Sequence, residues 1–339
     1  MENKKILNIE ILRVMAIIAV VLIHMTIPYF YDINLMNGNY TAWAFNNLYN
    51  AISRFCVPVF FIISAYLSFN GKSSKGVASR IKRLAIPYIS WSAIYFLYNG
   101  GSDIIEFIKK ITASNTSFHL WFLPPFIGYT LLLPAIKKMV SLDDGESQKY
   151  IIIIITIASI LPQAVIYAMN TFYGDYSFLS GVNNFGLSFP SLLTYAIAFP
   201  LLYRKVSITK CVFLYSAMVA LNLLVSLLVS EKTGKTDTFF YGYTTPFVFI
   251  SSFILFNIIM SADLSFISGF AKKTIISIGD CSFGVYLSHW IVYLILGRYG
   301  MVFTGRAIID PLLNTVIVFL ISFYLIYALK KIKYLRMFM

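Results

Sequence analysis

The stretch RVMAIIAVVLIHM, residues 13–25, decides the fold of this chain. Every side chain between Arg13 and His24 is apolar, and a run of this kind extended to roughly 20 residues is typical of a transmembrane helix. A cation and an imidazole in such a helix are costly unless they face protein or a watery cavity. We therefore expect one side of this helix to face the protein interior.

The composition extends this interpretation to the whole chain. Apolar residues make up 59% of the 339 residues, charged residues only 12%, and the mean hydropathy is +0.77. These values lie far from the usual balance of a soluble domain. The net charge of +13 would indicate nucleic acid only if the cations formed one face of a soluble domain, so we expect no nucleic-acid partner. The three cysteines have no metal-ligand spacing and are predicted to be packing residues.

Further apolar runs of similar length follow along the chain. We predict an all-α, polytopic membrane protein with a single domain over 1–339, in which the sixth span is the shortest and contains Pro190 and Pro200. The ten predicted spans are 8–28, 46–69, 81–99, 120–139, 150–169, 187–203, 210–230, 243–262, 279–298 and 308–330.

The distribution of Lys and Arg predicts the orientation. With the N-terminus in the cytoplasm, most cations fall in cytoplasmic segments, as the positive-inside rule requires, and ten crossings return the C-terminus to the cytoplasm. Lys4 and Lys5, before the first span, belong to this cytoplasmic set. The outer segments hold a minority, namely Lys109, Lys110, Lys232, Lys235, Arg298 and Arg306. Arg13 and Arg54 lie inside spans.

Arg13 and His24 share one side of the first helix. At 100° and 1.5 Å per residue they lie within about 20° of each other around the axis and about 16 Å apart along it. Glu10 belongs to the same stripe and can pair with Arg13. Taken alone, Arg13 could be a snorkelling anchor and His24 a structural histidine, but their alignment favours a functional role.

The other two histidines and Arg54 are further candidates. His119 is predicted to lie at headgroup level beside Trp121, and His289 to make a polar contact between helices. Three imidazoles could hold zinc, but no carboxylate or thiolate spacing supports this, and we predict no metal. Arg54 lies at a depth close to that of His24, where it could hold an anionic or sugar-bearing substrate or simply pair with a carboxylate.

A cationic loop, GKSSKGVASRIKRLAIPYISW, leads into the third span. Lys72 and Lys75 begin this cluster, which can be explained as a positive-inside flank. Arg80 and Arg83 are three residues apart on an incipient helix, however, so both guanidinium groups can point the same way and bind phosphate, with Lys82 between them.

These patterns together resemble the membrane acyltransferase-3 family over nearly the whole chain. The resemblance depends on Arg13 and His24 in the first span, FFIISAYL at 60–67, Arg80 and Arg83 before the third span, HLWFL at 119–123 and FGVYLSHW at 283–290. SRFCVPVFFIISAYL, HLWFL and YTTPFVF resemble the enterobacterial common antigen O-acetyltransferase branch in particular. Two positions depart from the family pattern: Ala65, where a Gly usually follows the serine matching Ser64, and Glu10, where Asp is usual.

The resemblance implies a multi-pass enzyme of the bacterial cytoplasmic membrane. Such an enzyme transfers an acetyl group from cytoplasmic acetyl-CoA to a hydroxyl of a glycan or an undecaprenyl-linked sugar on the outer side. Arg80, Lys82, Arg83 and Arg13 would bind the donor, and His24, with Arg13, would be catalytic. His24 would act as general base or as the site of a covalent acetyl-imidazole. Candidate acceptor-binding residues are Arg54, Ser64, His119, Trp121 and His289.

A transporter or flippase for a lipid-linked sugar or a small anionic solute is the main alternative, because buried Arg and His also line permeation paths. The chain shows no internal repeat and no pair of matching Gly/Pro-broken helices, which such transporters often have. A purely structural scaffold gives no reason for the aligned stripe. The acceptor, the acyl group and the oligomeric state are open at this point.

Overall fold

The computed structural model describes residues 6–71, 76–113, 115–141, 145–176, 178–181, 191–302 and 304–339. These residues form helices and connecting turns and contain no strand, which confirms the all-α prediction for this part of the chain. The cations Lys4, Lys5, Lys72 and Lys75, and Pro190 of the sixth predicted span, lie outside the described residues.

The helices follow one another along the chain with short connections. Their bounds are α1 Leu7–Phe30, α2 Ile33–Gly38, α3 Tyr40–Ser53, α4 Cys56–Phe69, α5 Val77–Tyr98, α6 Ile104–Thr112, η1 Phe118–Phe122, α7 Leu123–Met139, α8 Gly145–Phe172, η3 Ser191–Leu193, α9 Thr194–Leu202, α10 Ile208–Thr233, α11 Pro246–Ser261, α12 Gly269–Arg298, α13 Asp310–Leu329 and η4 Lys333–Phe338.

Within the described residues, seven helical segments are long and apolar enough to cross a membrane: α1, α3 with α4, η1 with α7, α8, α10, α12 and α13. Three predicted spans are not among them. The helix α5 has 22 residues but carries three cations near its start, and α11 has 16 residues. The helix α9 has only 9 residues, or about 14 Å, roughly half the hydrocarbon thickness.

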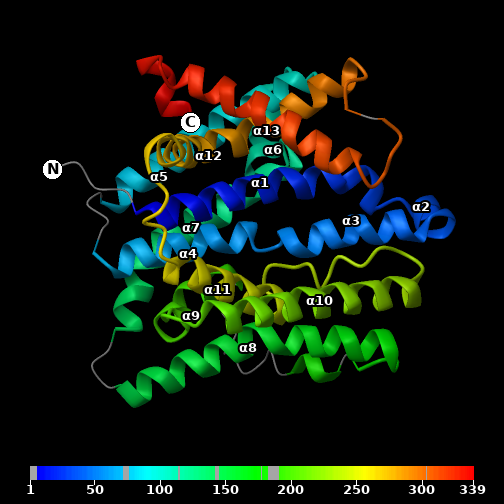
Figure 1. The fold of residues 1–339 in the computed structure, drawn as a ribbon, viewed down its shortest axis with the longest axis vertical. Coiled ribbons are helices and arrows are strands. Elements are labelled where there is room, and N and C mark those ends of the chain that lie inside the picture. The colour runs from blue at the N-terminus through cyan, green and yellow to red at the C-terminus, as the bar shows by residue number, and fades with distance from the viewer. Residues whose placement is uncertain are drawn as a thin grey trace.

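The start of α1 and the end of α13 lie at the same end of the helices (Figure 1). A chain whose two ends lie on one side of a membrane crosses it an even number of times. Seven is odd, so seven crossings alone would not return the chain to the side on which it starts, whereas any even number, ten included, would. Ten crossings remain a prediction, as does the cytoplasmic location of both ends.

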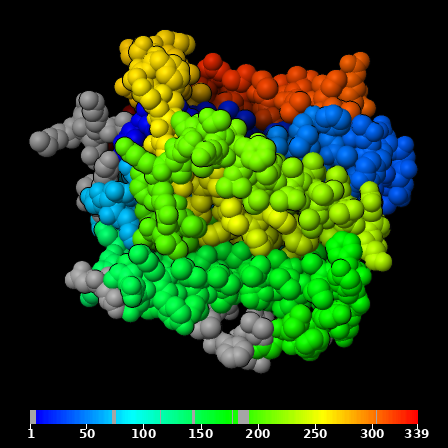
Figure 2. Space-filling view, turned by 60° about the horizontal axis from the view of Figure 1, so that its bottom comes forward, coloured from blue at the N-terminus to red at the C-terminus, as the bar shows by residue number. Residues whose placement is uncertain are grey.

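Three segments form the centre of the bundle and others its periphery. Half or more of the most apolar window is buried in α1, in α3 with α4, and in α12, whereas α8 and α10 bury only 17% and 22%. Apolar side chains that are not covered by protein suit contact with lipid. Figure 2 shows the green side chains of α8 along one edge of the molecule, as a lipid-facing helix requires.

The second predicted span is divided into two helices. The α3 helix ends at Ser53 and α4 begins at Cys56, with a turn at Arg54 and Phe55 between them. The first turn of α4 brings Cys56 and Val57 to the same pocket as Val20 and His24 of α1.

Candidate functional site

The three histidines of the chain meet at one place, although they come from α1, η1 and α12. The ring centroid of His289 lies 4.9 Å from that of His24 and 5.1 Å from that of His119, and the centroids of His24 and His119 are 6.1 Å apart. His289 and His119 are almost completely buried. The histidine cluster, as we call these three residues, lies near the end of α1 that the charge distribution assigns to the outer side.

His24 and His289 are joined by a direct hydrogen bond. The distance from Nδ1 of His24 to Nε2 of His289 is 2.6 Å, and the two ring planes differ by 10°. The centroid separation of 4.9 Å is close to this N···N distance plus one ring radius at each end. The two rings are therefore nearly coplanar and meet edge to edge, which is the geometry of an almost linear hydrogen bond. The predicted interhelical polar contact of His289 is confirmed.

His119 is held inside the protein by its neighbours. Its Nδ1 lies 2.8 Å from the Ser117 hydroxyl, and its backbone carbonyl accepts a hydrogen bond of 2.5 Å from the Tyr286 hydroxyl. Only 1% of His119 is exposed. The ring predicted to lie at headgroup level is thus enclosed by protein and packs against the other two histidines.

The backbone of α12 is adapted around His289. The Tyr95 hydroxyl of α5 donates a hydrogen bond to the Leu287 carbonyl at 2.8 Å and accepts one from the Ile291 amide at 3.1 Å. It thus stands between two groups that would bond each other in a regular α-helix. On α1, Pro28 has no N–H to bond the carbonyl of His24 four residues earlier. Both helices are therefore locally irregular beside the site.

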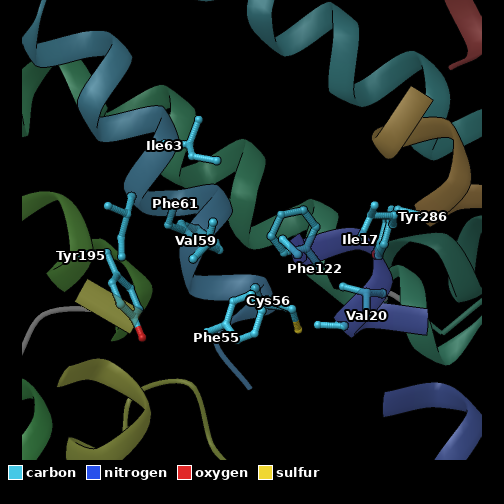
Figure 3. Packing of buried hydrophobic residues seen from close by; sticks show 14 of the residues in the cluster. Ile17, Val20, Phe55, Cys56, Val59, Phe61, Ile63, Phe122, Tyr195 and Tyr286 are labelled. Atoms are coloured by element: carbon cyan, nitrogen blue, oxygen red, sulfur yellow. The ribbon is translucent and has the colours of Figure 1, made fainter. Parts of the chain in front are cut away.

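A narrow pocket opens beside His24. Its walls come from α1, α4, η1, α12 and the segment before α11, and they are Val20, Ile23, His24, Cys56, Val57, His119, Trp121, Phe122, Tyr243 and Tyr286. Figure 3 shows the sulfur of Cys56 at the start of α4 pointing toward Val20 of α1. Trp121, 36% exposed, stacks on Tyr243 with ring centroids 5.5 Å apart. The pocket thus combines an imidazole with an aromatic pair at its rim.

Arg54 borders this pocket through Tyr243. Its guanidinium lies over the rings of Tyr241 and Tyr243, 5.1 and 5.9 Å from their centroids, and its Nη2 donates to Oδ1 of Asn50 at 2.6 Å. Asn50 in turn donates to the Thr26 hydroxyl of α1 at 2.7 Å. No carboxylate of the described residues lies within 4.0 Å of Arg54, and its buried Nε has no hydrogen-bond partner there. Of the two alternatives from the sequence, pairing with a carboxylate is therefore not seen.

Arg13 and Glu10 form the expected pair near the start of α1. Nη1 of Arg13 lies 2.8 Å from Oε1 of Glu10, which is 3% exposed, whereas the arginine side chain is 28% exposed. Gly279 of α12 leaves the space for this carboxylate, since a Cβ there would lie 2.1 Å from Oε2. Between this pair and His24 the same side of α1 is fully buried at Ile17, while Ile18 on another side is 38% exposed. The polar stripe of α1 faces the protein, as predicted.

The remaining predicted residues lie apart from the pocket. Arg80, Lys82 and Arg83 occupy the first two turns of α5, whose N-cap, Gly76, offers no side chain to bind the free backbone N–H groups. Lys82 and Arg83 are exposed and Arg80 is half-buried. Ser64 lies two turns beyond Cys56 along α4 and is not among the residues that line the pocket.

A family model described as an acyltransferase domain, acyltransferase family 3, matches residues 6–331. The chain belongs to the acyltransferase-3 family. No curated protein and no solved structure matches the chain significantly. Together with the seven apolar helices, membership identifies this acyltransferase-3 protein as a multi-pass membrane acyltransferase.

Several residues that hold the acyltransferase-3 site together were not predicted from the sequence. Asn50 binds Arg54 and Ser117 binds His119. Tyr95 bridges Leu287 and Ile291, on either side of His289, and Tyr243 lies between Arg54 and the pocket. One signal was available, because Asn50 lies four residues before Arg54, so both side chains fall on one side of a helix. Tyr243 begins the YTTPFVF stretch, which marked this segment without giving the tyrosine a role. Nothing in the sequence distinguishes Tyr95 from the other tyrosines of the chain.

Within the described residues, no group of three or more His, Cys, Asp or Glu side chains is arranged to hold a metal ion. The nitrogens that face each other in the histidine cluster are instead used in a direct hydrogen bond.

Proposed function

We propose that this protein is a transmembrane O-acetyltransferase. It would move an acetyl group from cytoplasmic acetyl-CoA to a hydroxyl of an envelope glycan or undecaprenyl-linked sugar at the outer side of the bacterial cytoplasmic membrane. The observation that carries the proposal is the polar stripe of α1 in a chain of this family. Glu10 and Arg13 lie near one end of the helix, His24 lies in a pocket near the other, and all face protein.

The donor would enter at the end of the bundle where α5 begins. Arg80, Lys82 and Arg83, together with the uncapped N-terminus of α5, offer charge and hydrogen-bond donors for the phosphates of acetyl-CoA. Arg13 would line the way inward. The rise from Arg13 to His24 is about 16 Å, a length that an extended pantetheine arm can bridge.

His24 would carry out the chemistry in the pocket. As a general base, it takes the proton of the acceptor hydroxyl while that oxygen attacks the thioester carbonyl; the C–S bond breaks, and the CoA thiolate leaves and is protonated. As a nucleophile, it first displaces the thiolate to form an acetyl-imidazole, which the hydroxyl then attacks. Both routes need an unprotonated ring nitrogen that faces the substrate.

The acceptor would be held at the rim of the pocket. Trp121 and Tyr243 form an aromatic pair suited to the apolar side of a sugar ring. Arg54 has no counter-ion in the described residues, so a phosphate or carboxylate of the acceptor would satisfy it, which favours an anionic or lipid-linked sugar. His119 and His289 lie beside His24, the reacting residue. Ser64 would contact the acceptor further along α4. The motif set favours an acceptor of the common-antigen type among envelope glycans.

Reconstitution in liposomes tests this function. The purified protein is incorporated into vesicles that contain radiolabelled acetyl-CoA, and envelope glycan fractions are added outside. We expect label on the outer glycan and a mass increase of one acetyl group. A flippase or transporter would leave the acceptor chemically unchanged, so unmodified glycan beside correctly folded protein would contradict the proposal.

A further inference from the structure

We propose that His289 is a positioning residue that holds His24 in one tautomer, with the proton on Nδ1, and thereby makes Nε2 the reacting nitrogen. The inference rests on the proposed function, in which His24 acts on the acyl group. It adds a residue with a defined role and selects one atom of His24 for the chemistry.

The argument begins at the far side of His289. Its Nδ1 lies 2.7 Å from the carbonyl oxygen of Tyr286 and 3.2 Å from that of Val285, both on α12 itself. Carbonyl oxygens only accept hydrogen bonds, so this nitrogen must carry the proton. A neutral imidazole has a single N–H, and His289 is fully buried, where a positive charge would be costly. Nε2 of His289 is therefore a lone-pair acceptor.

This acceptor determines the state of His24. Nδ1 of His24 lies 2.6 Å from Nε2 of His289 and must donate its proton to the lone pair of that nitrogen. The opposite assignment would place the lone pair of His289 Nδ1 against two carbonyl oxygens. With its proton on Nδ1, neutral His24 has its own lone pair on Nε2, which makes no hydrogen bond to any described residue. That nitrogen is the one available to substrate in the pocket.

The same bond becomes stronger during the reaction. When Nε2 of His24 accepts the hydroxyl proton, or forms a bond to the acetyl carbon, the ring becomes cationic and its Nδ1–H donates a charge-assisted hydrogen bond to His289. In Ser-His-Asp enzymes a carboxylate orients the histidine and stabilises its cation. No carboxylate of the described residues bonds either ring here, and a buried imidazole with a defined tautomer occupies the carboxylate's place.

Nitrogen NMR of isotopically labelled protein tests the assignment directly, because the chain has only three histidines. We expect the His24 resonances, identified by their loss in His24→Gln, to show a proton on Nδ1 and a lone pair on Nε2. His289→Leu, which removes the acceptor, should shift this ring toward the other tautomer, and His289→Gln, which keeps an acceptor oxygen, should retain the original one. A proton on Nε2 of His24 in the unsubstituted protein would overturn the proposal.

Kinetics separate positioning from packing. His289→Leu should lower kcat by about ten- to ten-thousand-fold, a range whose upper end is the loss caused by a wrong histidine tautomer in a serine protease, with the KM for acetyl-CoA nearly unchanged. His289→Gln should recover most of kcat. If kcat fell equally in both variants while His289→Gln kept the original tautomer, His289 would act only as a packing residue, and the positioning role would be contradicted. If neither the unsubstituted protein nor the two variants transfer acetyl groups, the proposed function is contradicted. The NMR result still decides the tautomer of His24.

Discussion

The histidine cluster and the cationic start of α5 are both predicted to act on acetyl-CoA, yet the structure holds them in opposite ways. His289 and His119 are buried, and residues from four different segments orient the cluster. Lys82 and Arg83 are exposed, and their relative position is set only by the helix α5 to which both belong. Proton transfer requires a defined nitrogen at a defined place, whereas phosphate binding tolerates flexible cations. Substitutions in the two regions should therefore fail in different ways.

Removing the imidazole of α1 should have the largest effect. We expect His24→Ala to lower acetyl transfer by about a hundred- to ten-thousand-fold, the usual contribution of a general base, while acetyl-CoA binding is retained. The measurement is label transfer in proteoliposomes together with equilibrium donor binding. Ile18→Ala, on the exposed side of the same helix, is the matched control. Unchanged turnover in His24→Ala would remove this residue from the chemistry.

The cationic start of α5 should affect donor affinity instead. Replacing Arg80 and Arg83 together by Gln should raise the KM for acetyl-CoA by about ten- to a hundred-fold, because hydrogen bonds to a charged group are lost. The control removes the same charge elsewhere: Lys109→Gln with Lys110→Gln changes α6, where Lys110 makes an exposed ion pair with Glu106 and lies over the ring of Phe96, 5.4 Å from its centroid. Equal donor affinity in both double variants would contradict the phosphate-binding role.

The close contact between Glu10 and α12 should depend on Gly279, because glycine has no Cβ to occupy the space of the carboxylate. In Gly279→Ala the new Cβ would meet Oε2 of Glu10, and we expect a loss of stability of about 1–3 kcal/mol from overpacking. Thermal unfolding in detergent measures it. Gly128→Ala in α7, where a Cβ meets nothing within 4 Å, should leave the unfolding temperature the same or slightly higher. The same result for both variants would show that α1 and α12 are less closely packed there.

The smallest effect should come from removing the Tyr95 hydroxyl, which supports the backbone of α12 on either side of His289. Tyr95→Phe removes the hydroxyl that bridges Leu287 and Ile291, and we expect a loss of about 1 kcal/mol in stability. Tyr98→Phe, on the same helix, removes a buried hydroxyl that has no partner among the described residues and should cost nothing. Thermal unfolding of the two variants compares them directly. A larger loss in Tyr98→Phe would show that the hydroxyl of Tyr95 does not support α12.

Much of the fold could be predicted from local pattern, with identifiable failures. The apolar runs located the long helices, and the spacing of Glu10, Arg13 and His24 predicted their shared side of α1 correctly, because helical periodicity is a local property. The break at Arg54 and the inward turn of His119 were not predicted. Both depend on which helices pack on either side of the segment, and a single apolar run does not contain that information.

The sequence by itself determined that this chain is a helical membrane protein, that one side of its first helix is polar, and which family it resembles. Hydropathy, charge and helical spacing are sums over neighbouring residues, so they can be read directly from the chain. Only the tertiary structure decided that His24, His119 and His289 form one cluster, and that two carbonyl oxygens of α12 determine the tautomer of His24. Hydrogen bonds depend on distance and direction between groups hundreds of residues apart, and these are set only when the helices pack.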